Sequence, residues 1–148
     1  MNIQSRSYFH TLIINTKFSV DTDVKQGCLE LLDFLIERPS LDLETSFYFD
    51  ELRKHVSLEI EDDDFIYSVF YLARPEINIL KQEFSAWKES EDDFVLVEDK
   101  SFILEMLRDK EYVNPFSGEE LSAEEFEEQV LTFFTPTSYF LEKRNVRI

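Results

Sequence analysis

Two glutamates and a lysine form the pattern in this sequence that comes nearest to a catalytic site. Glu98 and Lys100 directly follow the apolar run of residues 94–97, and Glu76 lies upstream, behind Pro75. Carboxylates at such positions can hold Mg²⁺, and a lysine beside them can assist the water that attacks a substrate. The chemistry that these residue types would support is therefore metal-dependent hydrolysis.

This pattern is similar to the acidic–x–Lys arrangement of restriction-type nucleases, and the resemblance implies Mg²⁺-dependent cleavage of nucleic acid. The sequence departs from that arrangement because Glu76 stands where the nucleases have an aspartate. A nuclease also needs a basic surface that retains its substrate, whereas this chain has a formal net charge of -17. We therefore expect no enzyme and keep a Mg²⁺-dependent nuclease as a second alternative only.

The remaining reactive side chains do not combine into a known kind of site. Cys28 is the single cysteine, so it cannot form a disulfide within the chain, and with His10 and His55 it does not complete a zinc site. Neither histidine has a recognisable nucleophile partner, and two separated glycines cannot form a phosphate-binding loop. We predict no catalytic residues, no bound metal and no cofactor.

Acidic residues are concentrated in the middle of the 148-residue chain. Residues 59–128 contain 22 of the 32 acidic residues but 6 of the 15 basic ones. Most of these acidic residues lie in three clusters, at 59–64, 89–93 and 119–128. Most of the surface therefore repels phosphates and anionic lipids. We expect neither direct nucleic-acid binding nor membrane binding.

Two interpretations of these clusters stay open. The carboxylates can be a solvated surface that keeps a chain with 15 Phe in solution. Alternatively, they dock on a basic protein, which relieves their mutual repulsion and steers the encounter. Under the second interpretation the predicted partner-binding carboxylates are Glu61, Asp62, Asp63, Asp64, Glu91, Asp92 and Asp93, and the aromatic anchors at the rim are Tyr67, Tyr71 and Trp87.

Periodic patterns define the helices and strands that would position these groups. Apolar residues at helical spacing predict helices over 22–38, 52–56, 62–74 and 102–108, with Asp21, Thr22 or Asp23 capping the first and Asp50 capping the second. A capping box at Ser122 and Glu125 predicts a further helix that carries Phe126, Val130, Leu131 and Phe134. Strands are predicted over 46–49, 77–80 and 94–97, the second extended to Trp87 and paired with the third in a hairpin. For residues 8–18, a strand and a short helix both stay open.

The order of helix, short strand, two helices and hairpin over about residues 22–98 resembles a winged-helix domain. We predict an α+β fold with this winged-helix-like centre, in a single domain of residues 1–148 with a C-terminal helical extension from about residue 101. In a winged helix that reads DNA, the helix before the hairpin carries lysines and arginines, whereas residues 62–74 contain three aspartates and one arginine. The resemblance is therefore to the winged helices that dock on proteins.

The function expected from these features is a non-catalytic, acidic protein-binding module of the inhibitor type, docking on a basic surface of its partner. Small acidic immunity proteins and phage-encoded DNA mimics are similar in size and charge, and no motif specific to either class is present. The alternative is a winged-helix accessory or adaptor subunit of a larger bacterial complex, such as a defence or chromosome-maintenance machine. Such a subunit would dock through apolar surface.

The two ends of the chain give the remaining predictions. No segment has the long apolar run of a signal peptide or a membrane span, so we expect a cytoplasmic protein. Aromatic residues near the C-terminus, at 133–134 and 139–140, lie where a single domain has little left to bury. This segment is predicted to dock on a second copy of the chain or on a partner.

Overall fold

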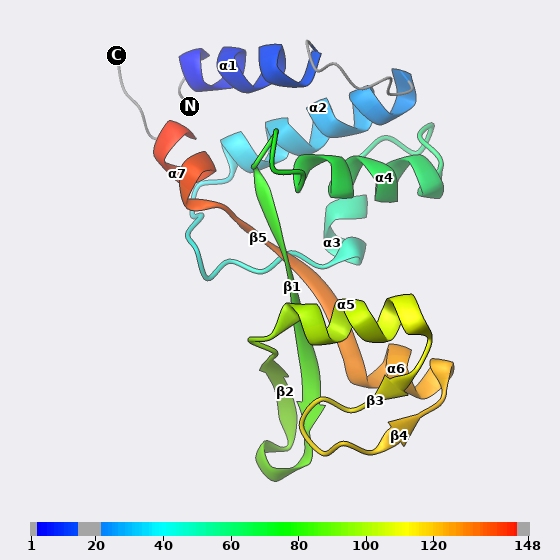
Figure 1. The fold of residues 1–148 in the computed structure, drawn as a ribbon. Coiled ribbons are helices and arrows are strands. Elements are labelled where there is room, and N and C mark those ends of the chain that lie inside the picture. The colour runs from blue at the N-terminus through cyan, green and yellow to red at the C-terminus, as the bar shows by residue number, and fades with distance from the viewer. Residues whose placement is uncertain (1–2, 15–21, 145–148) are drawn as a thin grey trace. The chain divides into compact units, whose positions relative to one another are not determined.

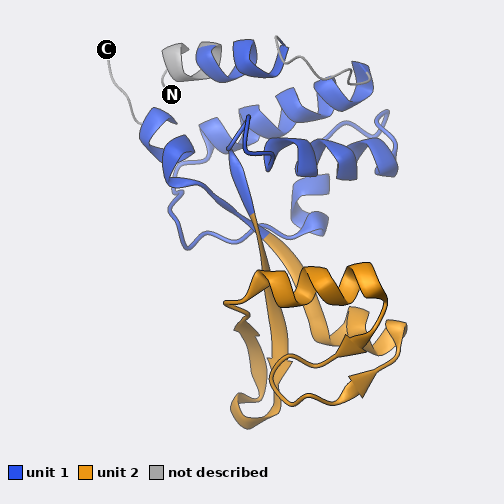
Figure 2. Ribbon diagram, in the orientation of Figure 1, with its two compact units in different colours: residues 1–81, 134–148 blue, residues 82–133 orange. Residues whose placement is uncertain are grey.

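The structure, a computed structural model, describes residues 3–14 and 22–144. They fall into two compact units (Figure 2): unit 1 comprises residues 1–81 and 134–148, and unit 2 comprises residues 82–133. Helices and a three-stranded sheet confirm the predicted α+β class (Figure 1). The prediction of a single domain over residues 1–148 stays a prediction.

Unit 1 is mainly helical. Its helices are α1 (Ile3–Ile14), α2 (Thr22–Glu37), α3 (Phe49–Arg53), α4 (Asp62–Leu72) and α7 (Ser138–Arg144). Helix α2 follows its apolar stripe and ends two residues before Pro39, and α4 ends three residues before Pro75, as predicted. Residues 8–14 belong to α1, so the helical alternative is correct there, whereas residues 15–18 and Asp21 lie outside the described residues.

Unit 2 is built around a β-hairpin. Within this unit, a 3₁₀ turn (Glu89–Glu91) and β2 (Asp93–Leu96) belong to the hairpin, and the elements that follow are α5 (Lys100–Asp109), β3 (Tyr112–Val113), β4 (Glu120–Leu121) and α6 (Ala123–Gln129). Strands β1 (Leu80–Lys88) and β5 (Val130–Pro136) have residues in both units, and the sheet order is β2-β1-β5. The predicted hairpin is confirmed by antiparallel pairing of β1 with β2, in which Trp87 lies opposite Phe94.

Helices α2 and α4 pack closely at Gly27. The Ser68 hydroxyl of α4 donates to the Val24 carbonyl of α2 at 3.0 Å and to its own helix at the Asp64 carbonyl, 2.7 Å away. A Cβ atom on Gly27 would lie 2.4 Å from that hydroxyl oxygen and 3.1 Å from the Ser68 Cβ. The glycine therefore permits the close approach of two helices, which offsets its low helix propensity.

Two predicted boundaries near β1 and α3 are wrong. Strand β1 begins at Leu80 rather than at Ile77, because Asn78 has a positive φ of 56° and turns the chain after α4. Helix α3 begins at Phe49 with Tyr48 at its N-cap, so Asp50 lies in the first turn and does not cap the helix. Of the predicted strand at 46–49, Phe47 alone pairs, and it pairs with Phe134 of β5 rather than with the hairpin.

The C-terminal third of the chain differs most from the prediction. The capping box is confirmed, since Ser122 Oγ accepts from the Glu125 amide at 3.1 Å and Glu125 Oε1 accepts from the Ser122 amide at 3.0 Å. The helix nevertheless ends at Gln129, because the β-branched and aromatic residues that follow form β5. The predicted C-terminal helices are confirmed in α5, α6 and α7, and three strands lie among them.

Three of the four C-terminal aromatic residues are buried, and Tyr139 is partly exposed. Phe134 and Phe140 are fully buried in the core of unit 1, and Phe133 is 8% exposed. The expectation that little is left for this segment to bury is therefore wrong for Phe133, Phe134 and Phe140, whereas Tyr139 is partly exposed and docking of the segment stays a prediction. Among the described residues, no helix is both long enough and apolar enough to cross a membrane.

We expect Gly27→Ala to lower the free energy of unfolding by about 1–3 kcal/mol, because the added methyl group must displace Ser68 from its two carbonyl acceptors. In an open helix the same change would stabilise the protein by about 1 kcal/mol. Urea unfolding measures the difference, with Gln26→Ala on the exposed side of α2 as the control. A Gly27→Ala variant more stable than wild type would contradict the close packing of α2 and α4.

Candidate protein-binding site

The predicted site residues form two groups, one in each compact unit. Those of unit 1 are Glu61, Asp62, Asp63, Asp64, Tyr67 and Tyr71, which precede or belong to α4. Those of unit 2 are Trp87, Glu91, Asp92 and Asp93, which belong to the hairpin and its turn. The structure therefore provides two candidate acidic surfaces.

The carboxylates of α4 occupy the start of the helix. Glu61 is the N-cap residue, and Asp62, Asp63 and Asp64 form the first turn, where the positive end of the helix dipole favours negative charge. Glu61, Asp62 and Asp63 are exposed, whereas Asp64 is partly buried. Three of the four predicted carboxylates in unit 1 are therefore open to a partner.

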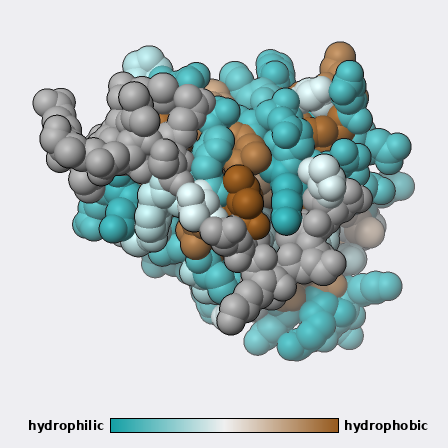
Figure 3. Space-filling view, turned by 90° about the horizontal axis from the view of Figure 1, so that it is seen from above, coloured by the Kyte–Doolittle hydropathy of each residue, from teal (hydrophilic) through white to brown (hydrophobic). Residues whose placement is uncertain are grey.

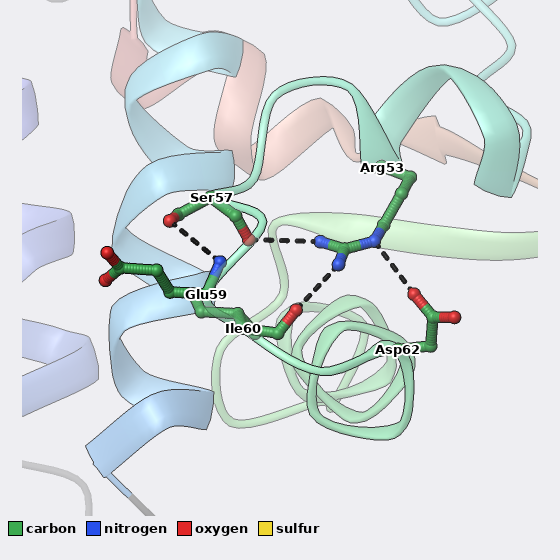
Figure 4. A network of polar contacts seen from close by, with 5 residues as sticks. All are labelled: Arg53, Ser57, Glu59, Ile60 and Asp62. Atoms are coloured by element: carbon green, nitrogen blue, oxygen red, sulfur yellow. Dashed lines mark hydrogen bonds and ion pairs between the residues drawn. The ribbon is translucent and has the colours of Figure 1, made fainter.

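Arg53 fixes the loop that leads into this helix (Figure 4). Its guanidinium donates to the Asp62 carboxylate at 3.0 Å, to the Ser57 carbonyl at 3.3 Å and to the Ile60 carbonyl at 2.6 Å. The same group lies over the ring of Phe65, 5.3 Å from its centroid. One planar cation thus ties two loop carbonyls to α4, which a point charge such as lysine cannot do as well.

Arg53 was not among the predicted site residues. It lies nine residues before Asp62, a separation that matches neither helical nor strand periodicity. The available signal was a pair of basic residues, Arg53 and Lys54, shortly before an acidic stretch.

The braced loop presents acidic and apolar side chains to solvent. Leu58 at its tip is 92% exposed, and the neighbouring Glu59 and Glu61 are exposed as well. Further hydrogen bonds restrain the backbone: the Glu59 amide donates to Ser57 Oγ at 3.3 Å, and the Ser57 amide donates to Glu30 of α2 at 3.4 Å. We call Leu58, Glu59, Glu61 and Asp62 the acidic loop surface.

The outer side of α4 is partly apolar. Ile66, Tyr67 and Phe70 are 41%, 51% and 41% exposed, so the predicted anchor Tyr67 does face solvent. Tyr71 is 1% exposed and belongs to the core, so the prediction that it is a rim anchor is wrong. The physical reason is helical geometry, because Tyr71 lies one turn beyond Ser68 at the edge of the buried side of α4.

The hairpin of unit 2 has the second acidic cluster. Glu91, Asp92 and Asp93 are exposed, and Asp92 adopts the left-handed conformation with a φ of 50°, which aspartate tolerates better than most residues. Lys88 lies 3.7 Å from the Glu91 carboxylate and over the ring of Phe116. Trp87 is partly buried and packs edge-on against Phe94, so one part of its ring is accessible.

An acidic groove beside α2 is a further feature that the sequence analysis did not select. Its volume is about 680 Å³, and its lining residues are Glu30, Asp33, Phe34, Glu37, Arg38, Pro39, Ser40 and His55. The three carboxylates follow the i, i+3, i+7 spacing of one helix side, which was the available sequence signal. His55 stacks on Phe34 with ring centroids 3.7 Å apart, and His10 lies 3.1 Å from the Asp33 carboxylate.

Hydrophilic side chains predominate on the face drawn in Figure 3, and hydrophobic side chains form small separate areas there. A partner that covers such a face meets charged and polar groups first. Electrostatic complementarity would therefore decide the rate and the specificity of its encounter.

The nuclease-like pattern is not assembled within one unit. Glu76 belongs to unit 1, whereas Glu98 and Lys100 belong to unit 2. The Lys100 ammonium donates to the Gln82 carbonyl at 2.9 Å and lies 3.3 Å from the Glu83 carboxylate, so it ties the start of α5 to β1. In the part of the chain that the structure describes, no cluster of His, Cys, Asp or Glu residues is arranged to hold a metal ion.

Cys28 is a core residue rather than an accessible nucleophile. Its side chain is fully buried, and its Sγ donates to the Ser68 carbonyl at 3.6 Å. Burial raises the pKa of the thiol to about 12, although the contact with Ser68 acts in the opposite direction. The neutral, enclosed thiol packs as a small apolar group.

Comparisons with protein-family models, with curated proteins and with solved structures found no match to this chain.

Replacing Arg53 tests whether it holds the loop. We expect Arg53→Met to lower the free energy of unfolding by about 2 kcal/mol, because two loop carbonyls lose a charged donor. Hydrogen exchange of the Ile60 amide, which donates to the Ser57 carbonyl, should also become faster. Arg53→Lys should give an intermediate result, and Arg108→Met, which changes an exposed arginine paired with its neighbour Asp109, should change neither quantity. Unchanged exchange in Arg53→Met would contradict the bracing role.

The buried thiol predicts a dependence of stability on pH. In the unfolded chain Cys28 ionises near its ordinary pKa of 9.0, whereas in the folded chain it ionises near 12. The unfolded state therefore loses its proton first, so the stabilising difference is complete below pH 9 and declines as the pH rises towards 12. Urea unfolding over that pH range should show that wild type loses stability relative to Cys28→Ala as the pH rises. A difference independent of pH would contradict the burial of the thiol.

Proposed function

We propose that this protein is a non-catalytic binding module that docks on a basic surface of a partner protein through the acidic loop surface. The observation that carries the proposal is the Arg53-braced loop, which keeps Glu59, Glu61 and Asp62 exposed in one short segment. Crowded carboxylates repel each other, and a cationic partner relieves that repulsion.

The bracing supports binding because it reduces the entropy that docking must remove. Ser57 and Ile60 both have carbonyls bonded to Arg53, and Ser57 is also bonded to α2 through Glu30. A loop restrained before the encounter loses little freedom when a partner covers it. The carboxylates are therefore presented in the arrangement that the partner meets.

Leu58 supplies an apolar contact among these charges. An apolar side chain that charged residues surround has the arrangement of an apolar contact within a polar rim. The partner that fits this surface has a small apolar pocket bordered by lysines or arginines. The α2 groove reaches the same loop through Glu30, and it adds carboxylates on that side.

The exposed hairpin carboxylates of unit 2 extend the attraction over a longer range. With a net charge of -17, the whole chain steers towards cationic surfaces, and this steering weakens as salt is added. An inhibitor that covers the positive groove of a nuclease or of a DNA-binding protein would use such steering.

A second candidate function is an adaptor subunit that docks through apolar surface. The observation that favours it is the exposed stripe of Ile66, Tyr67 and Phe70 on α4. Binding through this stripe would depend little on ionic strength, whereas binding through the acidic loop surface would weaken steeply as salt rises.

Charge reversal in the loop tests the proposal. Peptides selected on the wild-type protein from a display library of random sequences are expected to combine lysine or arginine with an apolar residue. Glu59→Lys together with Glu61→Lys should weaken their binding about tenfold at low salt and flatten its salt dependence. Fluorescence polarisation of labelled peptides over a series of salt concentrations measures both effects.

The matched control reverses two exposed glutamates of α6, Glu127→Lys with Glu128→Lys, which changes the net charge equally. Leu58→Ala should weaken binding at all salt concentrations, whereas Leu43→Ala, at another exposed leucine, should not. If the loop variant binds as tightly as wild type with the same salt dependence, the acidic loop surface is not the docking site. Salt-insensitive binding that is lost in Tyr67→Ala would support the adaptor instead.

A further inference from the structure

The outer side of α4 presents a continuous strip of exposed or partly exposed side chains, of which Phe70 also packs against Phe49 and Phe134. Ile66, Tyr67 and Phe70 lie in its middle, Asp63 lies at its N-terminal end, and Arg74 follows its C-terminal end. The positions i, i+3, i+4 and i+7 of this set share one side of a helix. Together they line a shallow groove of about 290 Å³. We call these five residues the α4 face.

The α4 face is more apolar than its surroundings. Three large side chains at least 41% exposed lie next to each other on it, in a chain where charged residues make up 32%. Single exposed apolar residues are ordinary on protein surfaces, but contiguous ones on a helix commonly mark a contact. The face shares no residue with the acidic loop surface, which consists of the loop before α4 and the first residue of the helix, Asp62.

Opposite charges at its two ends make the α4 face complementary to itself. Asp63 lies in the first turn of α4, and Arg74 lies just beyond the last. The Arg74 guanidinium is kept along the face, since it donates to the Tyr67 hydroxyl at 3.5 Å and lies over the ring of Tyr71. When two such helices pack antiparallel, the acidic end of each meets the basic end of the other.

We propose that the α4 face is the contact for a second copy of this chain, packed antiparallel about a two-fold axis. In that arrangement Tyr67 and Phe70 of both copies form the centre, and Asp63 of each copy lies opposite Arg74 of the other. A two-fold interface requires this self-complementarity, because the same patch serves both copies. Antiparallel packing also places the positive end of each helix dipole beside the negative end of the other.

The net charge of each copy opposes this association. Two chains of charge -17 repel over a distance comparable to the Debye length, and one helix pair buries less surface than a standard stable interface. The dimer is therefore weak, and added salt strengthens it by screening the long-range repulsion. This salt dependence is opposite in sign to that of the basic-partner contact, so the two contacts can be tested independently.

Reversing the charge at either end of the α4 face tests the proposed dimer. Sedimentation velocity of the full chain over a range of protein concentrations is expected to show a reversible dimer of wild type that is favoured by moderate salt. Asp63→Arg and Arg74→Glu should each weaken it about tenfold, because each variant places like charges opposite each other. Mixing the two variants should restore dimers, as heterodimers in which every charge pair is again opposite.

The matched controls change exposed residues of the same unit outside the α4 face. Asp50→Arg and Lys54→Glu alter the net charge by the same amounts, and mixing them should produce no gain in dimer. Thermal unfolding followed by circular dichroism checks that each variant is folded. A wild type that stays monomeric at every concentration and salt level would overturn the proposal, as would a mixture of the two charge variants that forms no heterodimer.

Discussion

The packing of α4 on α2 is the contact on which both the acidic loop surface and the α4 face depend. Gly27 lets the two helices approach until the Ser68 hydroxyl reaches the Val24 carbonyl, and this contact sets the rotation of α4 about its axis. Phe65 and Val69 are thereby buried, and the side with Tyr67 and Phe70 turns to solvent. A different rotation would bury the tyrosine and expose the core phenylalanine instead.

Arg53 extends this constraint into the loop before α4. The chain has fewer basic than acidic residues, and here one arginine donates hydrogen bonds to two carbonyls and a carboxylate. The result is a short ordered segment in which Asp62 is paired with Arg53, while Glu59 and Glu61 remain exposed to solvent. Lys100 acts similarly in unit 2, where it joins α5 to β1 through Glu83. In both places a partly buried cation organises the chain locally, and the exposed carboxylates set the charge of the surface.

Local signals predicted the elements whose chemistry is complete within a few residues. The capping box at Ser122, the aspartates at the start of α4 and the prolines after α2 and α4 all have local physical causes, and each was located correctly. Strand β5 was missed because its apolar residues continue the helical spacing of α6. Its extended form gains pairing partners, such as Phe47, from distant parts of the chain. The candidate surfaces show the same division. The charge clusters correctly indicated exposed carboxylates such as Asp62 and Asp93, whose role in binding stays a prediction, whereas Arg53 and the α2 groove were not predicted.

The sequence by itself determined the α+β class and the acidic character of the surface, because composition and short-range periodicity carry that information. Only the tertiary structure decided which aromatic residues face solvent. Tyr67 and Tyr71 are one helical turn apart and chemically identical, yet one is half exposed and the other is in the core. Four residues rotate a helix by about 40° beyond a full turn, which brings Tyr71 nearer than Tyr67 to the buried side of α4 that contains Ser68 and packs against α2. A contact between segments 40 residues apart leaves no mark in the local sequence.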